Sequence, residues 1–274
     1  NNSVSFTKES MSYNQKLDLT ELGAADWVQI AAADANSISI ERKNTSAPKI
    51  SDIGFTSDAT GAYGPIAGAS DWAILTKWSD GTTTEVSDPA PATNNIGAGK
   101  TAGLRYVGNC YEFTVEGQPY EQELILSLGA WQSLSRLTVS FEDGSEVFVT
   151  DTVDSKVDKI GGGLATAHYN NKGAKLFTIK FKATEPGERI TVRYGAEKSY
   201  ATNEQATFQA AMLRRTPGSD IKSELRTLYE ANKDKEQGNY TDATWTEFQN
   251  ALEAAKTVLD NESATEAQVN EALE

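Results

Sequence analysis

The sequence has little of the chemistry on which most active sites depend. Its 274 residues include one cysteine, Cys110, and one histidine, His168. A single cysteine cannot form a disulfide within the chain. A single histidine cannot build a histidine-rich metal site or, without a matching nucleophile motif, a catalytic triad. The motifs of serine hydrolases, zinc proteases and P-loop nucleotidases are also missing. We therefore expect this chain not to be an enzyme.

Positive charge and long apolar runs are equally scarce. The chain carries 25 Lys and Arg against 39 Asp and Glu, for a formal net charge of −14. Nucleic acids and anionic membranes attract clustered Lys and Arg, and no such cluster occurs. No apolar run is long enough to span a bilayer. We expect neither a nucleic-acid partner nor membrane insertion, and the acidity favours an extracellular location.

What the chain does have is strand patterning up to about residue 216. In residues 124–131 and 134–141 every second residue is apolar, as in strands with one buried face. An Asp143-Gly144 turn follows and leads into residues 146–150, which predicts a hairpin. Residues 175–182, 189–194 and 205–213 continue the pattern, and the last of these is expected to close a sheet. Many short strands without intervening helices predict an antiparallel β-sandwich for residues 1–216.

Two stretches of this part lack periodicity. They are residues 58–70, rich in Gly and Ala, and residues 87–100. We expect them to form long loops at one end of the sandwich, where ligands commonly bind.

The pattern changes at residue 217. Ile221, Leu225 and Leu228 recur at helical spacing, and the acidity rises to a net −8 over residues 217–274. Thr241 is a predicted N-cap, with Tyr240 and Trp245 placed to form a hydrophobic staple. Thr265 and Gln268 predict a capping box that opens a third helix. Residues 217–274 are therefore expected to form a second domain of three helices, with Trp245 in its core.

Strings within the first domain resemble an accessory β-sandwich module of large secreted bacterial proteins, many of them glycoside hydrolases. The strings are residues 17–27, 78–81, 108–115, 129–131 and 187–192. The resemblance implies a jelly roll of the galactose-binding or malectin-like type, a glycan or polysaccharide partner, and a catalytic domain elsewhere on the same chain. It also implies that the protein is secreted or associated with the cell wall.

The helical part resembles the FIVAR module of extracellular and cell-wall proteins of Gram-positive bacteria. The resemblance rests on the Tyr240-Thr241…Trp245 start and the segment from Ala264 to Val269. It implies a three-helix bundle whose third helix is truncated here.

Sugar binding needs flat aromatic faces together with a few hydrogen-bonding side chains in a shallow site. Trp72, beside the Gly- and Ala-rich loop, and Tyr63 within it are the leading candidate ligand-binding residues, followed by Trp78. For each there is a structural alternative. Trp72 and Tyr63 could anchor a long loop on the sheet, and Trp78 could pack in the core.

A structural calcium ion is the one cofactor considered, and none is required. Asp151, Asp154 and Asp158 could supply its oxygen ligands. The alternative is that these carboxylates are ordinary solvated charges.

Two functions follow from these observations. The first is a non-catalytic carbohydrate-binding module with a helical spacer, from a secreted or cell-wall-attached glycoside hydrolase. The second is a purely structural or adhesive pair of modules that contacts the cell wall or a host protein without binding sugar. An exposed apolar patch without a sugar-sized groove would favour the second.

Overall fold

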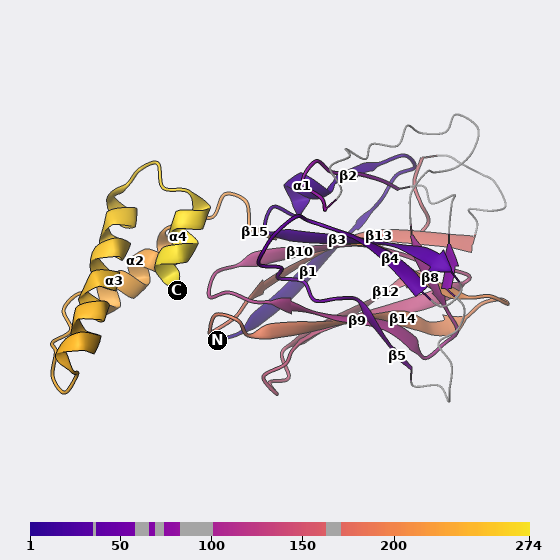
Figure 1. The fold of residues 1–274 in the computed structure, drawn as a ribbon. Helices are drawn as coiled ribbons and strands as arrows, with labels where there is room; N and C mark the ends of the chain where they lie inside the picture. The colour runs from indigo at the N-terminus through magenta and orange to yellow at the C-terminus, as the bar shows by residue number, and fades with distance from the viewer. Residues whose placement is uncertain (35–36, 58–65, 69–73, 83–100, 163–170) are drawn as a thin grey trace. The chain divides into compact units, whose positions relative to one another are not determined.

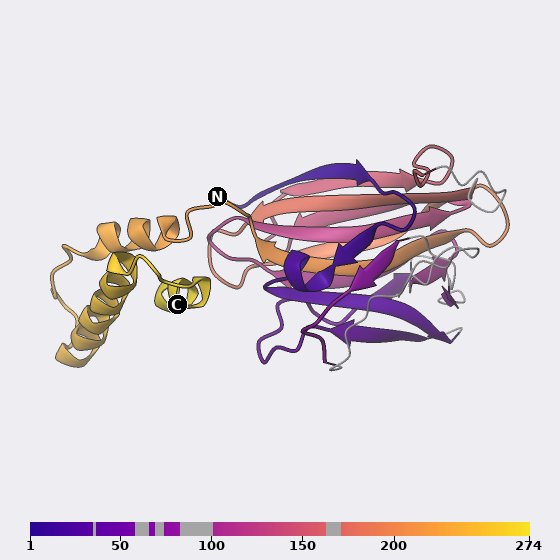
Figure 2. The ribbon, with the colours of Figure 1, turned by 90° about the horizontal axis from the view of Figure 1, so that it is seen from above.

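The computed structural model describes residues 1–34, 37–57, 66–68, 74–82, 101–162 and 171–274. The chain divides into two compact units, Asn1–Thr216 and Pro217–Glu274. Figures 1 and 2 show that the first is built of strands and the second of helices.

The first unit is an antiparallel sandwich of two large sheets, which confirms the predicted fold class. The eight-stranded sheet has the order β1-β13-β10-β15-β3-β4, and β8 and β6 extend it beside β15. Its strands are β1 (Ser3–Ser10), β3 (Asp26–Asp34), β4 (Ser37–Arg42), β6 (Ile66–Gly68), β8 (Ala102–Arg105), β10 (Gln122–Trp131), β13 (Lys172–Lys182) and β15 (Gln205–Arg215). The strand predicted to close the sheet, β15, instead lies inside it, paired with β10 on one side and with β3 and β8 on the other.

The five-stranded sheet has the order β12-β11-β14-β9-β5. Its strands are β5 (Gly54–Ser57), β9 (Asn109–Glu116), β11 (Ser133–Phe141), β12 (Phe148–Asp154) and β14 (Arg189–Ser199). The pairing of β11 with β12 confirms the predicted hairpin. Side chains of β9 alternate strictly between buried and partly exposed, so one face of this sheet packs inward and the other forms the surface.

The main core fills the space between the two sheets. Its largest members are aromatic side chains of both sheets, and the ring of Phe208 in β15 packs on Tyr111 and Phe113 of β9 with centroids 5.4 and 5.6 Å apart. The hydroxyl of Tyr111 donates to the carbonyl of Ala102 at 2.6 Å, and burial raises its pKa well above the ordinary value. The two sheets are therefore fixed in register by buried rings with satisfied hydroxyls.

A second core lies on the other face of the eight-stranded sheet. It is covered by the short helix α1 (Leu19–Leu22) and a small parallel pair, β2 (Lys16–Asp18) and β7 (Leu75–Lys77). Because both faces of the large sheet are covered, β10 is almost continuously buried. The five-stranded sheet keeps its outer face exposed.

The second unit contains the helices α2 (Ser223–Asn232), α3 (Asp242–Asp260) and α4 (Glu266–Leu273). Their shared core consists of Leu225, Ala255 and Val269. Thr241 caps α3, and Thr265 with Gln268 forms the capping box of α4, as predicted. The expectation that Trp245 lies in this core is wrong, because the ring is only half-buried and stacks between Tyr240 and Phe248.

None of the described helices is long and apolar enough to cross a membrane.

Candidate functional site: a hollow on the outer sheet face

Trp78, one of the predicted ligand-binding residues, lies in the second core. Its side chain is 4% exposed, and its ring centroid is 5.5 Å from that of Trp27, itself fully buried. The carboxylate of Asp80 accepts hydrogen bonds from Trp27 Nε1 at 2.9 Å and from the Thr20 hydroxyl at 2.8 Å, and pairs with Lys43. A ring buried this deeply offers no face to a sugar. Residues 17–27 and 78–81 are two of the segments that resemble the accessory β-sandwich module. These contacts bring the two segments together in one structural cluster.

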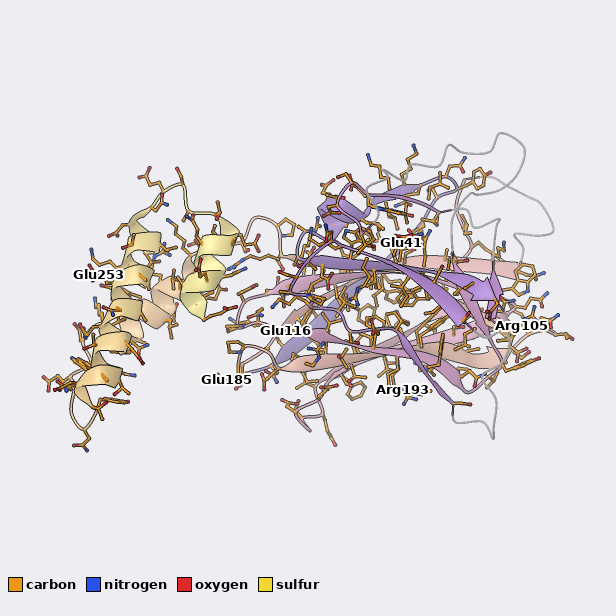
Figure 3. The ribbon with its side chains drawn as sticks, in the orientation of Figure 1. Glu41, Arg105, Glu116, Glu185, Arg193 and Glu253 are labelled. Carbon is orange, nitrogen blue, oxygen red and sulfur yellow. The ribbon has the colours of Figure 1, made fainter. Side chains whose placement is uncertain are left out.

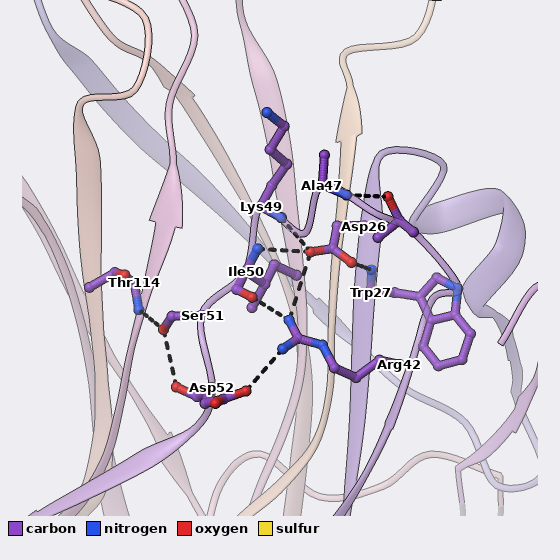
Figure 4. Close-up of polar contacts among 10 residues, drawn as sticks. Asp26, Trp27, Arg42, Ala47, Lys49, Ile50, Ser51, Asp52 and Thr114 are labelled. Carbon is purple, nitrogen blue, oxygen red and sulfur yellow. Dashed lines mark hydrogen bonds and ion pairs between the residues drawn. The ribbon is translucent and has the colours of Figure 1, made fainter. Parts of the chain in front are cut away.

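Another carboxylate, Asp26, also has a structural role. It is fully buried and accepts from the backbone N–H groups of Trp27, Lys49 and Ile50 at 2.7 to 2.9 Å, as Figure 4 shows. The guanidinium of Arg42 lies 3.9 Å away. These hydrogen bonds hold the segment after β4 against β3. Because backbone N–H groups already bond to both carboxylate oxygens of this buried residue, Asp26 is not available to bind a ligand.

Of the three predicted metal ligands, Asp151 and Asp158 face lysines and Asp154 faces a tyrosine hydroxyl. Lys8 Nζ is 3.3 Å from the Asp151 carboxylate and 3.8 Å from that of Asp158, and Asp158 is also 3.6 Å from Lys175. Asp154 accepts from the hydroxyl of Tyr200 at 3.1 Å. Among the described residues, no group of three or more His, Cys, Asp or Glu side chains is placed to hold a metal ion. The calcium site stays a prediction.

Trp72 and Tyr63 lie outside the described residues, as do His168, most of the stretch 58–70 and all of 87–100.

The described surface also contains a hollow that the sequence does not predict. It has a volume of about 350 Å³ and lies on the outer face of the five-stranded sheet. Figure 3 shows Arg193, one of its residues, on this face of the sandwich. The hollow is lined by Val107, Gly108, Cys110, Arg136, Thr138, Arg193, Gly195, Ala196 and Glu197. These residues come from β9, β11, β14 and the turn before β9.

The floor of the hollow depends on a glycine. Gly195 in β14 pairs with Arg136 of β11 on one side and with Cys110 of β9 on the other. A Cβ at this position would lie 2.1 Å from the carbonyl oxygen of Asn109 and 2.6 Å from the Cys110 sulfur. No side chain fits there, so the row of side chains across the sheet is interrupted and a depression forms.

One wall is an arginine–carboxylate pair created by a β-bulge. The register of β11 against β14 shifts between Leu134 and Ser135, which leaves Glu197 as the extra residue of β14. Glu197 meets Arg136 in a two-point contact, through Nε to one oxygen and through Nη2 to the other at 3.3 Å. Arg136 Nη1 also donates to the Thr150 hydroxyl at 3.1 Å. The hydrogen bond that Arg136 donates to Glu197 raises the pKa of Arg136, which stays charged.

The neighbouring arginine is held in a similar way. Arg193 Nε lies 3.1 Å from the Glu112 carboxylate, and its Nη2 donates to the Thr56 hydroxyl at 3.1 Å. Arg193 and Arg136 flank Gly195, and each is oriented by an acceptor on a neighbouring strand. Both guanidinium groups are therefore set in place before any ligand arrives.

The turn before β9, which contributes Val107 and Gly108 to the lining of the hollow, is strained at the preceding residue, Tyr106. Asn109 N donates to the Tyr106 carbonyl at 3.3 Å, which closes a turn with Gly108 at φ +94°. Tyr106 itself has φ +74°, and its residue is 46% exposed, with Val107 40% exposed. Glu204 holds the turn by accepting from the backbone N–H groups of Tyr106 and Val107 at 3.4 Å. An exposed aromatic residue is thus kept in a conformation that costs roughly 1–2 kcal/mol.

Only part of this arrangement left a signal in the sequence. The segment 108–115 belongs to the resembling strings, and Tyr106-Val-Gly108 has the glycine of a tight turn. The bulge at Glu197 and the pairing of Arg136 with Gly195 depend on register between strands about 60 positions apart in sequence. Local patterning does not carry that information.

Chemically, the hollow offers charged donors and acceptors beside apolar surface. The guanidinium groups donate, the Glu197 carboxylate accepts, and Val107 provides an exposed apolar side chain, with Tyr106 next to it in the chain. Such a set suits a small polar ligand that also has an apolar face.

A family model of the FIVAR domain matches residues 221–274, which confirms the resemblance found in the helical unit. Comparison with curated proteins gives no match. Among solved structures, the chain is similar to a chain with the CBM51-2 module in complex with GlcNAc and the INT domains of Clostridium perfringens ZmpB. The identity is 13% and the TM-score 0.29, over 98% of this chain and 60% of that one. The same modules in a second structure give 13% identity and a TM-score of 0.24, over 97% and 60%.

The third similar structure is the enzymatically active domain of tailspike protein 4 from bacteriophage CBA120. It is 11% identical with a TM-score of 0.29, over 61% of this chain and 19% of that one. This chain therefore spans at most 60% of the length of these structures. Likeness at these TM-scores indicates no ligand for this chain.

Proposed function

We propose that the sandwich is a non-catalytic carbohydrate-binding module and that the helical unit is a spacer beside it. Both would belong to a large secreted or cell-wall-attached bacterial glycoside hydrolase whose catalytic domain lies elsewhere on the same chain. The match of residues 221–274 to the FIVAR domain supports a modular protein of this kind. The sandwich would raise the local concentration of the catalytic domain on a glycan, an effect of tethering that needs no catalytic residue.

One observation carries the proposal for the sandwich. Tyr106 is held in solvent by a strained turn, next to a hollow that contains two oriented arginines. Backbone strain persists only where surrounding contacts enforce it, and such residues concentrate at binding sites. An aromatic side chain with polar groups beside it is the combination that a sugar needs, because a sugar ring presents C–H groups on its faces and hydroxyls at its edge.

A second function has its own supporting observation. Phe148 in β12 is 56% exposed and Val157 is 73% exposed. Apolar side chains of this size at the surface also suit contact with a protein. A structural or adhesive module that contacts the cell wall or a host protein is therefore the alternative.

The proposal is tested by a glycan-array screen of the whole chain in three forms, the wild type, Tyr106→Ala and Trp72→Ala. We expect binding to a defined class of glycan that Tyr106→Ala abolishes. Loss in Trp72→Ala alone would move the site to the loop around residue 72. Absence of any glycan binding by the folded protein, with calcium present, would contradict the proposal and leave the adhesive function.

A further inference from the structure

Each arginine of the hollow is paired with a carboxylate, although only one of the two carboxylates, Glu197, lines the hollow itself. Arg136 pairs with Glu197 and Arg193 pairs with Glu112. The two arginines and two carboxylates therefore leave no net charge, on a chain whose formal charge is −14. Two such neutral ion pairs give little electrostatic preference to an anionic ligand, and the field of the acidic chain disfavours one.

Arg136 is anchored along one edge and still has hydrogens to donate. Its Nε and one hydrogen of Nη2 face Glu197, and one hydrogen of Nη1 faces Thr150. Each terminal nitrogen of a guanidinium carries a second hydrogen. Among the described residues, no other acceptor meets these hydrogens of Arg136. They lie in the plane of the guanidinium, which its three contacts fix.

Glu197 supplies the complementary acceptor. Each of its carboxylate oxygens accepts one hydrogen bond from Arg136, and a carboxylate oxygen has capacity for a second. The side chains of Arg136 and Glu197 are 42% and 47% exposed, so solvent reaches both. A donor and an acceptor therefore stand side by side at the edge of the hollow, held together by the bulge in β14.

We propose that this donor–acceptor pair recognises an uncharged sugar through two neighbouring hydroxyl groups, one that accepts from Arg136 and one that donates to Glu197. The inference rests on the proposed carbohydrate-binding function and adds the chemical class of the ligand. A hydroxyl donates and accepts at once, so adjacent hydroxyls satisfy both members of the pair without breaking the contact between them. An anionic sugar would bring its carboxylate close to that of Glu197 and be repelled by it.

The test uses the whole chain and titrations followed by NMR. The neutral probes are the methyl glycosides of galactose and N-acetylglucosamine, which both carry adjacent free hydroxyls. The anionic probe is the methyl glycoside of galacturonic acid, and the 4-deoxy form of the N-acetylglucosamine glycoside removes one member of the only adjacent hydroxyl pair of that sugar. The protein variants are Glu197→Gln, Arg136→Lys and the control Phe148→Ala, which changes an exposed side chain of the same sheet outside the hollow. Circular dichroism confirms that each variant is folded.

We expect a neutral probe to bind with an affinity that salt leaves unchanged. The 4-deoxy analogue, Glu197→Gln and Arg136→Lys should each weaken binding by about tenfold or more, since each removes a hydrogen bond to a charged group. Arg136→Lys keeps the charge but loses the fork geometry. Phe148→Ala should bind as the wild type does.

Two results would overturn the inference in distinguishable ways. Binding of galacturonate alone, with an affinity that falls as salt rises, would refute the hydroxyl-pair recognition and leave the carbohydrate function standing. Failure of all the probes to bind the folded wild type would count against the inference and the proposed function together.

Discussion

The carboxylate of Asp80 accepts a hydrogen bond from the indole nitrogen of Trp27 at 2.9 Å, across 53 positions of sequence. Asp80 lies two residues after Trp78, whose ring packs on Trp27. The pair therefore ties the small parallel sheet β2-β7 and the residues that follow it to β3 of the sandwich. The tryptophans and Asp80 support the fold on the face opposite the main core.

Replacement of Asp80 by Asn should lower stability in a way that depends on pH. Burial raises the pKa of Asp80, but the hydrogen bonds from Lys43, Trp27 and Thr20 outweigh it and hold the pKa below the ordinary value of 3.8. A depressed folded-state pKa stabilises the fold at pH values above the ordinary one, and the contribution disappears as pH falls below it. We expect Asp80→Asn to lose about 1 to 2 kcal/mol in urea unfolding at pH 7. At pH 3 the difference from wild type should be smaller; an equal difference at both pH values would contradict this account.

Trp78→Phe should affect stability and leave ligand binding unchanged. The smaller ring leaves a cavity beside Trp27, and we expect the free energy of unfolding to fall by about 1 to 3 kcal/mol. The measurement is urea unfolding together with a glycan titration of the folded variant. Loss of glycan affinity without loss of stability would restore Trp78 to the binding residues.

The sandwich was predictable because many of its strands are long and alternate apolar and polar residues. The turn at Asp143-Gly144 and the alternation on either side sufficed for the β11–β12 hairpin. The position of β15 inside the sheet was not predictable. Alternation of apolar and polar residues identifies a strand but does not show which strands pair with it. The segment Ile66–Gly68, read as part of a loop, pairs with β8 as a short strand. Three residues are too few to show a period.

The candidate site was harder to predict than the fold. Trp78 is a predicted ligand-binding residue because it is aromatic. A large aromatic ring is equally suited to packing in a core, and Trp78 packs in the second core. The hollow is instead defined by the absence of a side chain at Gly195 and by a bulge at Glu197. Neither has a local sequence signature, because both arise from the register of paired strands.

The predicted calcium site around Asp151, Asp154 and Asp158 can be tested through Lys8. The ammonium of Lys8 lies within 4 Å of both Asp151 and Asp158 and is the positive charge that the two share, with Lys175 as a further partner of Asp158. We expect Lys8→Met to lower the free energy of unfolding by about 1 to 2 kcal/mol, because the two carboxylates then lose their shared partner. Calcium should raise the melting temperature of Lys8→Met more than that of the wild type. An equal response of the two proteins, each measured against a sample treated with EDTA, would rule out a calcium site between these carboxylates.

Loss of the threonine in the capping box of α4 should destabilise the helical unit more than loss of a threonine inside a helix. The Thr265 hydroxyl accepts from Gln268 N, and the Gln268 side chain accepts from Thr265 N. Thr265→Ala should cost about 0.5 to 2 kcal/mol and reduce the helical circular dichroism signal. Thr257→Ala is the matched control, because Thr257 lies inside α3 and alanine favours a helix interior. Similar losses in both variants would contradict a special role for the cap.

The strained turn at Tyr106 is proposed to present an aromatic side chain to a sugar. The most direct test replaces Tyr106 with glycine and measures glycan affinity and the free energy of unfolding on the same sample. Glycine tolerates φ +74° without the steric cost that tyrosine bears. We expect glycan binding to be lost while stability stays unchanged or rises by up to about 1 kcal/mol. Phe148→Ala, the matched exposed aromatic, should retain affinity. Unchanged glycan affinity in Tyr106→Gly would contradict the account.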